Sequence, residues 1–463
     1  NCFNDLFKIY MNENIFRAYD IRGNAEQDLT PDVLLKIGFV LGNKVKDSGS
    51  DAIYVGHDSR LSCQRIFTDL CVGINGAGIK VLNLGLVPTP MVYYATNVGS
   101  TSHGVMITGS HNPKNDNGLK IVLGGSPASG LDILNYVKKV ESCEASERNI
   151  ENTSFEDQYI HEVVLKSSTS KKLKIVLDSG NGAAGILAHK TFTALGHETI
   201  SINQEPDGNF PNHHPDPSKE KNLAQIKSEI SANNADLGLA FDGDGDRVGL
   251  ITNNGHFVLS DHIIMMLAEY YLKQTKGPVV FDVKCSDELG KIIEQNGGEP
   301  IMEKTGHFNI KNTIKNTNAV LGGEMSGHLF INHEWYGFDD AIFSGAMLSK
   351  IVAESGKSAS DIKDHFPKTY STPELNLNVK DEIKFQMIET FLREMDFGDA
   401  KINTIDGVRV TIDGAWGLLR ASNTSPKFVL RFEGDTEDSM LSIQERFEQN
   451  LRKVFPDLDL NYH

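Results

Sequence analysis

Short apolar segments alternate with longer amphipathic segments along the first three quarters of the chain. Three apolar segments end at an acidic residue, at Asp58, Asp178 and Asp282. A helix-like segment follows each of them, and a second apolar segment then begins after a glycine. Strands that alternate with helices at this spacing are typical of βαβ units with parallel strands. The pattern therefore predicts three sequential, similar α/β domains with mixed, mainly parallel sheets.

A third apolar segment in each repeat is followed directly by a polar motif, starting at Thr108, Asp242 and Gly323. Ligands of α/β sheets bind at the carboxyl ends of strands, so we expect the three loops to face one central cleft. From about Ser371 the pattern changes to alternating strands and a final helix, which predicts a smaller C-terminal α+β domain. The expected domains are residues 1–154, 155–256, 257–368 and 369–463.

The composition narrows the possible partners and the cellular location. The chain has 463 residues and a formal charge of −17, which argues against nucleic acid or an anionic membrane as the main partner. Its five cysteines have no CxxC spacing, so we expect reduced thiols and a cytoplasmic protein. The oligomeric state stays open between a monomer and a small homo-oligomer. Because Met11 lies just before the first motif, residues 1–10 are interpreted as an added extension.

Three carboxylates, those of Asp242, Asp244 and Asp246, are separated only by glycines between two apolar segments. Such a cluster repels itself unless a cation neutralises it, and carboxylate oxygens suit Mg²⁺. A calcium-binding EF-hand loop is excluded, because Arg247 stands at the sixth position and Asn253 at the twelfth, where glycine and glutamate are needed. The alternative is a solvated acidic turn. We interpret the cluster as a magnesium site in an enzyme that handles phosphate.

Ser110 is the candidate nucleophile. It lies in the motif that begins at Thr108, where Gly109 permits an unusual turn and Asn112-Pro113 ends any helix. We therefore expect Ser110 to stand exposed at the tip of the turn. The alternative is a turn whose polar side chains bond only their own backbone. The motif is not the G-x-S-x-G elbow of hydrolases.

Five motifs in this order resemble those of a known enzyme family. They are Phe-Arg-Ala-Tyr-Asp-Ile-Arg-Gly23, Thr-Gly-Ser-His-Asn-Pro113 with Asn-Gly-Leu-Lys120, Phe-Asp-Gly-Asp-Gly-Asp-Arg247, Gly-Glu-Met-Ser-Gly-His328 and Arg-Ala-Ser-Asn-Thr-Ser-Pro426. Together they are similar to the α-D-phosphohexomutases, and the first resembles the bacterial phosphomannomutase/phosphoglucomutase branch. The resemblance implies reversible transfer of a phosphoryl group between C1 and C6 of mannose and glucose phosphates.

The resemblance also implies a mechanism and its cofactors. Ser110 would carry a phosphoryl group and donate it to a sugar monophosphate. A bound hexose 1,6-bisphosphate, which also acts as activator, would turn over before Ser110 takes the phosphoryl group back. Mg²⁺ would be held by Ser110, Asp242, Asp244 and Asp246, which suits a reaction dominated by positioning and electrostatics.

Further site residues follow from the same motifs. Lys120 and His328 are the candidates for proton transfer, supported by Arg22, because a histidine titrates near neutrality and a lysine beside cations has a lowered pKa. Glu324 and Ser326 would bind the sugar hydroxyls that glucose and mannose share. Arg420, Ser422, Asn423 and Thr424 can form an anion cradle, with a simple polar turn as the alternative, and the resemblance implies that they bind the non-reacting phosphate. The remaining substrate contacts implied by the resemblance are Tyr19, Arg247, Lys284 and His307.

Four other functions were weighed. The segment from Gly180 to Gly185 fits G-x-G-x-x-G, with Glu205 beyond it, which is typical of NAD-dependent oxidoreductases. That function would leave the acidic cluster and Ser110 without a role. A magnesium-dependent sugar-phosphate phosphatase and a catalytically silent sensor of sugar phosphates are two more alternatives. Phosphoglucosamine mutase is the alternative within the family, but Gly109 and Met325 stand where that branch typically has alanine and glutamine.

Overall fold

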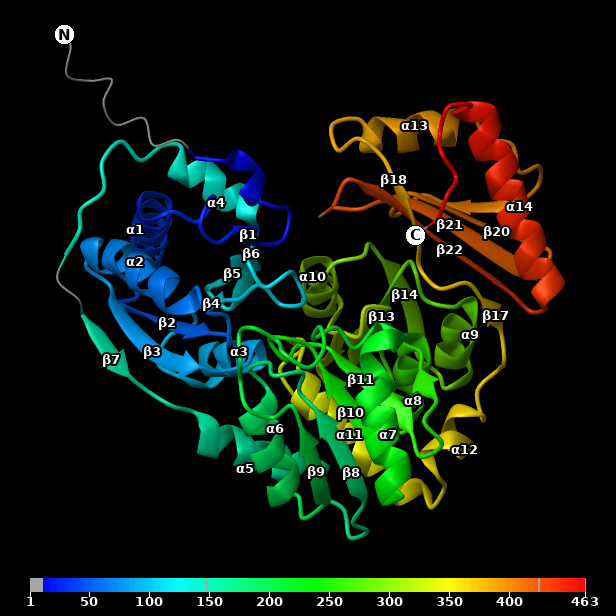
Figure 1. Ribbon diagram of the computed structural model, residues 1–463, viewed down its shortest axis with the longest axis horizontal. Helices are drawn as coiled ribbons and strands as arrows, with labels where there is room; N and C mark the ends of the chain where they lie inside the picture. The colour runs from blue at the N-terminus through cyan, green and yellow to red at the C-terminus, as the bar shows by residue number, and fades with distance from the viewer. Residues whose placement is uncertain (1–10, 147–148, 424, 463) are drawn as a thin grey trace.

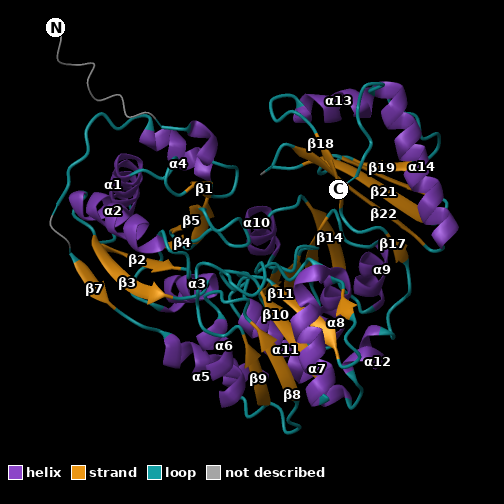
Figure 2. Cartoon of the chain, viewed as in Figure 1, coloured by secondary structure: helices purple, strands orange, loops and turns teal. Residues whose placement is uncertain are grey.

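The computed structural model describes residues 11–146, 149–423 and 425–462. The chain forms four consecutive domains, which the colours of Figure 1 follow from blue to red. The first three each contain a sheet flanked by helices, and the fourth is an antiparallel sheet with two helices (Figure 2). The expected α/β class with an α+β C-terminal domain is confirmed. Within the described part of the chain, no helix combines the length and apolar character needed to cross a membrane.

Domain 1 is built around the strand order β5-β4-β2-β3. Strand β2 (Ala52–His57) pairs in parallel with β3 (Lys80–Leu86) and with β4 (Gly104–Ile107), and β5 (Asp116–Leu123) returns antiparallel to β4. The other elements of domain 1 are η1 (Glu13–Ile15), β1 (Ile21–Asn24), α1 (Pro31–Asp47), α2 (Cys63–Gly76), α3 (Thr89–Val98), β6 (Ser126–Ala128), α4 (Gly130–Val137) and β7 (Ile150–Asn152).

Domains 2 and 3 repeat this order of strands. The order is β11 (Val248–Thr252), β10 (Leu237–Phe241), β8 (Lys174–Asp178) and β9 (Glu198–Ile202) in domain 2, and β16 (Leu329–Ile331), β15 (Leu321–Gly323), β13 (Pro278–Asp282) and β14 (Glu299–Glu303) in domain 3. In domains 2 and 3 the central strand, β8 or β13, has a parallel neighbour on each side. The strand that comes last in the chain order, β11 or β16, is antiparallel to its neighbour. The threefold repeat predicted from the apolar pattern is therefore present in the fold.

The helices of domains 2 and 3 cover these sheets. The other elements are α5 (Glu156–Ser167), α6 (Gly185–Ala194), η2 (Glu220–Leu223), α7 (Ala224–Asn233) and β12 (Phe257–Val258) in domain 2, and α8 (Ser260–Leu272), α9 (Asp287–Gln295), α10 (His307–Thr317), α11 (Ala341–Ser355) and α12 (Ala359–Lys363) in domain 3. Helix α11 packs against strands of both sheets, and Phe192 and Phe343 belong to one continuous buried cluster. Domains 2 and 3 thus share a core, which fixes their loops relative to one another.

Domain 4 has the sheet order β17-β22-β21-β20-β19, with β18 also paired to β22. Its elements are β17 (Tyr370–Ser371), β18 (Leu375–Asn378), α13 (Lys384–Glu394), β19 (Lys401–Asn403), β20 (Val408–Ile412), β21 (Ala415–Ala421), β22 (Lys427–Gly434) and α14 (Glu437–Val454). Helices α13 and α14 pack on the sheet around a separate core that includes Phe391, Phe432 and Phe447. Two buried arginines join this sheet to domain 3: Arg409 Nη1 donates to the Cys285 carbonyl at 2.9 Å, and Arg431 Nη1 donates to the Lys284 carbonyl at 2.5 Å.

Candidate active site

The Ser110 loop (residues 108–113) follows β4 and has a left-handed backbone at Ser110, with φ of 51°. The Ser110 hydroxyl donates to Asp242 Oδ2 at 2.9 Å, so the candidate nucleophile meets the acidic loop of domain 2. The expected exposure of Ser110 is wrong, because only 1% of the residue is accessible. The acidic loop covers it: a Cβ on Gly243 would lie 2.4 Å from the Ser110 carbonyl oxygen.

Arg60 stabilises the Ser110 loop by hydrogen bonds to its carbonyl groups. Its guanidinium donates to the carbonyls of Ser110 at 2.8 Å, Asn112 at 2.7 Å and Pro113 at 2.6 Å. Arg60 is buried and ion-paired with Asp58, the acidic residue at the end of β2. No motif in the sequence points to Arg60. The nearest signal was Asp58, because a buried acidic residue at a strand end calls for a cationic partner.

The three acidic side chains of the metal motif are completely buried at the end of β10 and lie within ligand distance of one another. Burial raises the pKa of Asp242, and repulsion by Asp244 and Asp246 raises it further. Asp242 Oδ1 accepts the backbone amides of Asp246 and Arg247, both at 3.1 Å, which fixes the loop. Asp244 Oδ1 is buried without a hydrogen-bond partner in the described structure. Such a donor set fits a hard divalent cation, so the buried cluster is able to bind a metal.

Lys120 enters this cluster from β5 of domain 1. Its Nζ donates to Asp244 Oδ2 at 2.6 Å and also contacts Asp246. Burial by itself would lower the pKa of Lys120, but the two carboxylates raise it above its usual value. The expected lowering of this pKa by neighbouring cations is therefore wrong, since carboxylates are its nearest charged groups. Thr89 at the start of α3 adds a hydrogen bond of 2.5 Å to Asp244 Oδ2.

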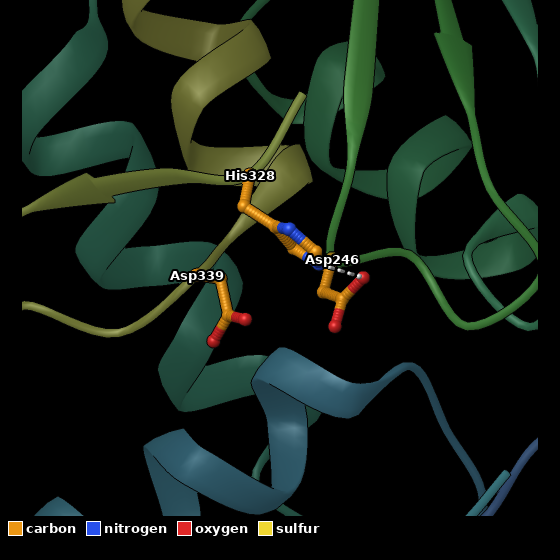
Figure 3. Close-up of side chains that lie close together, drawn as sticks. All are labelled: Asp246, His328 and Asp339. Atoms are coloured by element: carbon orange, nitrogen blue, oxygen red, sulfur yellow. Dashed lines mark ion pairs between the residues drawn. The ribbon is translucent and has the colours of Figure 1, made fainter. Parts of the chain in front are cut away.

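His328 connects the acidic loop to the Glu324 loop (residues 323–328) of domain 3. Its Nε2 lies 3.3 Å from Asp246 Oδ1, the ion pair drawn in Figure 3, and its Nδ1 lies 2.9 Å from Glu324 Oε2. Burial lowers the pKa of His328, but Asp246 and Glu324 outweigh burial and raise it to about 9. His328 is thus more basic than the near-neutral titration expected. Arg247 Nε also lies 3.3 Å from His328 Nε2, and Ser326 Oγ lies 2.9 Å from Nδ1.

Tyr19 links domain 1 to domains 3 and 4. Its hydroxyl donates to the Thr305 carbonyl at 3.0 Å and accepts from Asn423 Nδ2 at 2.6 Å. Burial raises the pKa of Tyr19 to about 12, assisted by the charge of Asp406. Asp406 Oδ2 also accepts hydrogen bonds from Arg420 Nε, at 2.8 Å, and from the backbone amide of Thr305. The segment that begins at Arg420 (residues 420–423 and 425–426, the Arg420 loop) is thereby held near Thr305.

The other predicted residues occupy the edges of this region. Lys284, just after β13, donates to Glu374 Oε2 of domain 4 at 3.2 Å. Arg22 donates to Asp20 at 2.6 Å and to Asn112 Oδ1 at 3.2 Å, beside the Ser110 loop. His307 begins α10 and is buried. Ser422 Oγ accepts the amide of Ser425 at 3.2 Å, which shapes the Arg420 loop. Thr424 and the interpretation of residues 1–10 lie outside the described residues.

The glycine-rich turn from Gly180 to Gly185 packs against another loop of the protein. Ala183 N donates to the Gly243 carbonyl at 2.9 Å, and a Cβ on Gly182 would lie 2.8 Å from that same oxygen. The turn therefore packs directly against the acidic loop, where a dinucleotide would need its pyrophosphate. These glycines serve close packing, and the alternative of an NAD-dependent oxidoreductase is not supported.

Family models match all four domains. They are described as phosphoglucomutase/phosphomannomutase α/β/α domains I, II and III and C-terminal domain, and they match residues 13–142, 155–255, 259–370 and 374–450. The chain belongs to the phosphoglucomutase/phosphomannomutase family. The expected resemblance and the expected class of enzyme, an intramolecular phosphotransferase, are thereby confirmed.

Individual relatives agree along the whole length. A phosphomannomutase/phosphoglucomutase of Pseudomonas syringae pv. tomato is 45% identical over 97% of this chain and 97% of its own. A phosphoglucomutase of Neisseria gonorrhoeae is 41% identical over 96% of this chain and 98% of its own. A crystal structure of a phosphoglucomutase/phosphomannomutase family protein from Burkholderia thailandensis superposes with a TM-score of 0.91 at 38% identity, covering 97% of this chain and 99% of that one. Membership thus extends to every domain that contributes a loop to the site.

Proposed function

We propose that this chain interconverts the 1- and 6-phosphates of both mannose and glucose through a phosphoserine at Ser110. The single observation that carries the proposal is the hydrogen bond of 2.9 Å between Ser110 Oγ and Asp242 Oδ2. It places a hydroxyl nucleophile against a cluster of carboxylates that fits a divalent cation. That juxtaposition is what phosphoryl transfer needs, because the reaction depends on positioning and on neutralising negative charge.

Ser110 is held for in-line transfer by its backbone. The left-handed φ at Ser110, the contact with Gly243 and the Arg60 hydrogen bonds to the loop carbonyls all restrict where its hydroxyl can point. In the forward step the P–O bond to Ser110 Oγ breaks and a P–O bond to a sugar hydroxyl oxygen forms. The sugar then carries two phosphates. Ser110 takes a phosphoryl group from the other end of this bisphosphate, which regenerates the phosphoserine.

Asp242, Asp244 and Asp246 would hold Mg²⁺ together with the phosphate on Ser110. When bound, Mg²⁺ supplies charge that neutralises the phosphoryl oxygens during each transfer. Asp242 is already fixed by two backbone amides, so its carboxylate is oriented before a cation arrives. Lys120 provides positive charge at Asp244 and Asp246, the same place where the phosphoryl oxygens would lie.

Proton transfer falls to Lys120 or His328. Because neighbouring carboxylates raise the pKa of both side chains, one of them has to lose its proton before it can accept the proton of the sugar hydroxyl, and the same group returns that proton in the reverse step. Both side chains border Asp246, one from domain 1 and one from domain 3. Arg22 stabilises the Ser110 loop through Asn112 and adds positive charge beside it.

Substrate binding is assigned to the loops of domains 3 and 4. Glu324 and Ser326 would accept hydrogen bonds from sugar hydroxyls common to glucose and mannose. The guanidinium of Arg420, with Ser422, Asn423 and Thr424, would hold the non-reacting phosphate, since arginine matches phosphate oxygens bidentately. The link from Tyr19 to Asn423 supports this assignment, because it ties the phosphate-binding loop to domain 1. Arg247, Lys284 and His307 complete the binding surface.

The test follows purified protein with Mg²⁺ and a trace of glucose 1,6-bisphosphate by phosphorus NMR. Parallel samples contain mannose 1-phosphate, glucose 1-phosphate or glucosamine 1-phosphate. We expect the first two to give 6-phosphates without inorganic phosphate. Faster conversion of the glucosamine compound would favour phosphoglucosamine mutase, and release of inorganic phosphate would favour a phosphatase. Omitting the bisphosphate tests its role as activator.

A further inference from the structure

A second group of metal-ligating side chains lies on the far side of Asp246. Asp246, His328 and Asp339 are buried, and one ligand atom of each lies within 4.8 Å of the others. Figure 3 shows His328 pointing toward Asp246, with the Asp339 carboxylate to one side of this pair. This group is distinct from the magnesium set, because it includes an imidazole and takes two of its members from domain 3.

Unsatisfied polar atoms mark the same place. Asp339 Oδ2 is buried and has no hydrogen-bond partner among the described residues, and the same holds for both ring nitrogens of His307. His307 and Asp339 are 7% and 0% exposed, and His307 Nδ1 lies 4.0 Å from Asp339 Oδ2. Buried polar groups without partners are rare and costly, so the pair formed by Asp339 Oδ2 and His307 Nδ1 indicates a missing ligand.

His328 is oriented as metal-binding histidines are. Glu324 Oε2 lies 2.9 Å from His328 Nδ1, and Nε2 faces Asp246. A carboxylate on one ring nitrogen fixes the tautomer and raises the basicity of the other nitrogen as a ligand. Asp246 serves both sites: its Oδ2 contacts Lys120 and its Oδ1 faces His328. Imidazole with carboxylates suits Zn²⁺, whereas Mg²⁺ prefers oxygen ligands and water.

Three cations border the group, and only one has to move. Lys120 contacts Asp246 through Oδ2 and leaves Oδ1 open, and Lys311 donates to Asp339 Oδ1 at 2.7 Å and leaves Oδ2 open. Arg247 Nε lies 3.3 Å from His328 Nε2, so a metal bound to Nε2 would displace it. Ligand atoms of a tetrahedral zinc site lie roughly 3.3–3.6 Å apart, given bonds of about 2.0–2.2 Å. The side chains would therefore close by roughly 1 Å.

We propose that Asp246, His328 and Asp339 form a second divalent-cation site that prefers Zn²⁺ to Mg²⁺, and that the His307 ring, whose Nδ1 lies 4.0 Å from Asp339 Oδ2, turns toward the bound ion as a further donor. Zn²⁺ bound there withdraws His328 and one oxygen of Asp246 from the reaction, and so inhibits the enzyme even when Mg²⁺ is saturating. The inhibition rests on the proposed mutase function, whereas the binding does not.

Binding is tested with metal-free protein in excess Mg²⁺. Isothermal titration with Zn²⁺ gives the affinity, and Co²⁺ as a probe reports imidazole ligation by its visible absorption. We expect one Zn²⁺ per chain, and at least a tenfold weaker affinity in Asp339→Asn, which keeps an oxygen for Lys311. Asp364→Asn, an exposed residue of the same domain, is the matched control. Zn²⁺ binding to Asp339→Asn as tight as to the unaltered protein, or no binding in excess Mg²⁺, would overturn the proposal.

Two further measurements separate folding from binding and binding from function. Circular dichroism checks Asp339→Asn, and if it does not fold, His307→Gln measured for Zn²⁺ affinity replaces it, with the same expected weakening. In excess Mg²⁺, Zn²⁺ should inhibit mutase turnover of the unaltered protein but not of Asp339→Asn, which binds Zn²⁺ more weakly. Equal inhibition of the two proteins would contradict the proposed site. A protein that binds Zn²⁺ as expected but shows no mutase turnover would refute the proposed function alone.

Discussion

Lys120 Nζ lies 2.6 Å from Asp244 Oδ2, although 124 residues separate them in the chain. A strand of domain 1 thereby places a cation inside the acidic cluster of domain 2. Two buried carboxylates with this one lysine between them are stable only while a cation is present, because removing one partner leaves buried charge unpaired.

Lys120→Met is expected to destabilise the metal-free protein by about 3–5 kcal/mol, the usual cost of breaking a buried ion pair. Mg²⁺ should restore much of this loss, since it neutralises the same carboxylates. Thermal unfolding with chelator and with Mg²⁺ measures both effects. Lys114→Met, an exposed lysine nearby, serves as control. If Mg²⁺ stabilises both variants equally, Lys120 and Mg²⁺ do not neutralise the same carboxylates.

Ser110→Ala is expected to reduce turnover by at least roughly a thousandfold, as removal of a nucleophile does, without loss of folding. The phosphorus NMR assay measures turnover, and circular dichroism checks the fold. Ser102→Ala, an exposed serine in the same domain, should leave activity unchanged. Activity of Ser110→Ala within tenfold of the unaltered protein would refute the phosphoserine mechanism.

Arg420→Ala is expected to raise KM by roughly ten- to a hundredfold, because a charge-assisted contact with phosphate contributes about 1.5–3 kcal/mol. Steady-state kinetics with glucose 1-phosphate measures the change. Arg393→Ala is the control, because it removes another arginine of domain 4 whose side chain is 68% exposed. If KM is the same in both variants, Arg420 does not bind the phosphate.

Glu374→Gln is expected to make the free energy of unfolding less dependent on pH in the acid range. Lys284 lowers the pKa of Glu374 from 4.5 to about 2. The stabilisation from this ion pair is therefore present above pH 4.5 and is lost as the pH falls toward 2. Urea unfolding of the unaltered protein and of the variant across this range measures the difference. Glu394→Gln, at an exposed site, should retain the full dependence, and parallel curves for the two variants would contradict the assignment.

The sequence anticipated the repeated topology because the relevant signals are local. Each strand is a short apolar segment, and each site motif is a contiguous run of residues; the motifs that begin at Thr108 and Asp242 follow directly after β4 and β10. The chain order of β2, β8 and β13, with their parallel neighbours, follows from that spacing. By contrast, the sharing of one core by Phe192 and Phe343 depends on how α11 packs between two sheets, and no periodicity reports it.

The sequence by itself determined the family and the class of each domain, and it predicted the roles of Ser110, the three aspartates and Arg420. Tertiary structure decided that Ser110 is buried, that Arg60 supports its loop, and that Lys120 and His328 meet at Asp246 with raised pKa values. The physical reason is that side-chain type is local, whereas burial and the sign of the neighbouring charges depend on segments brought together from distant parts of the chain.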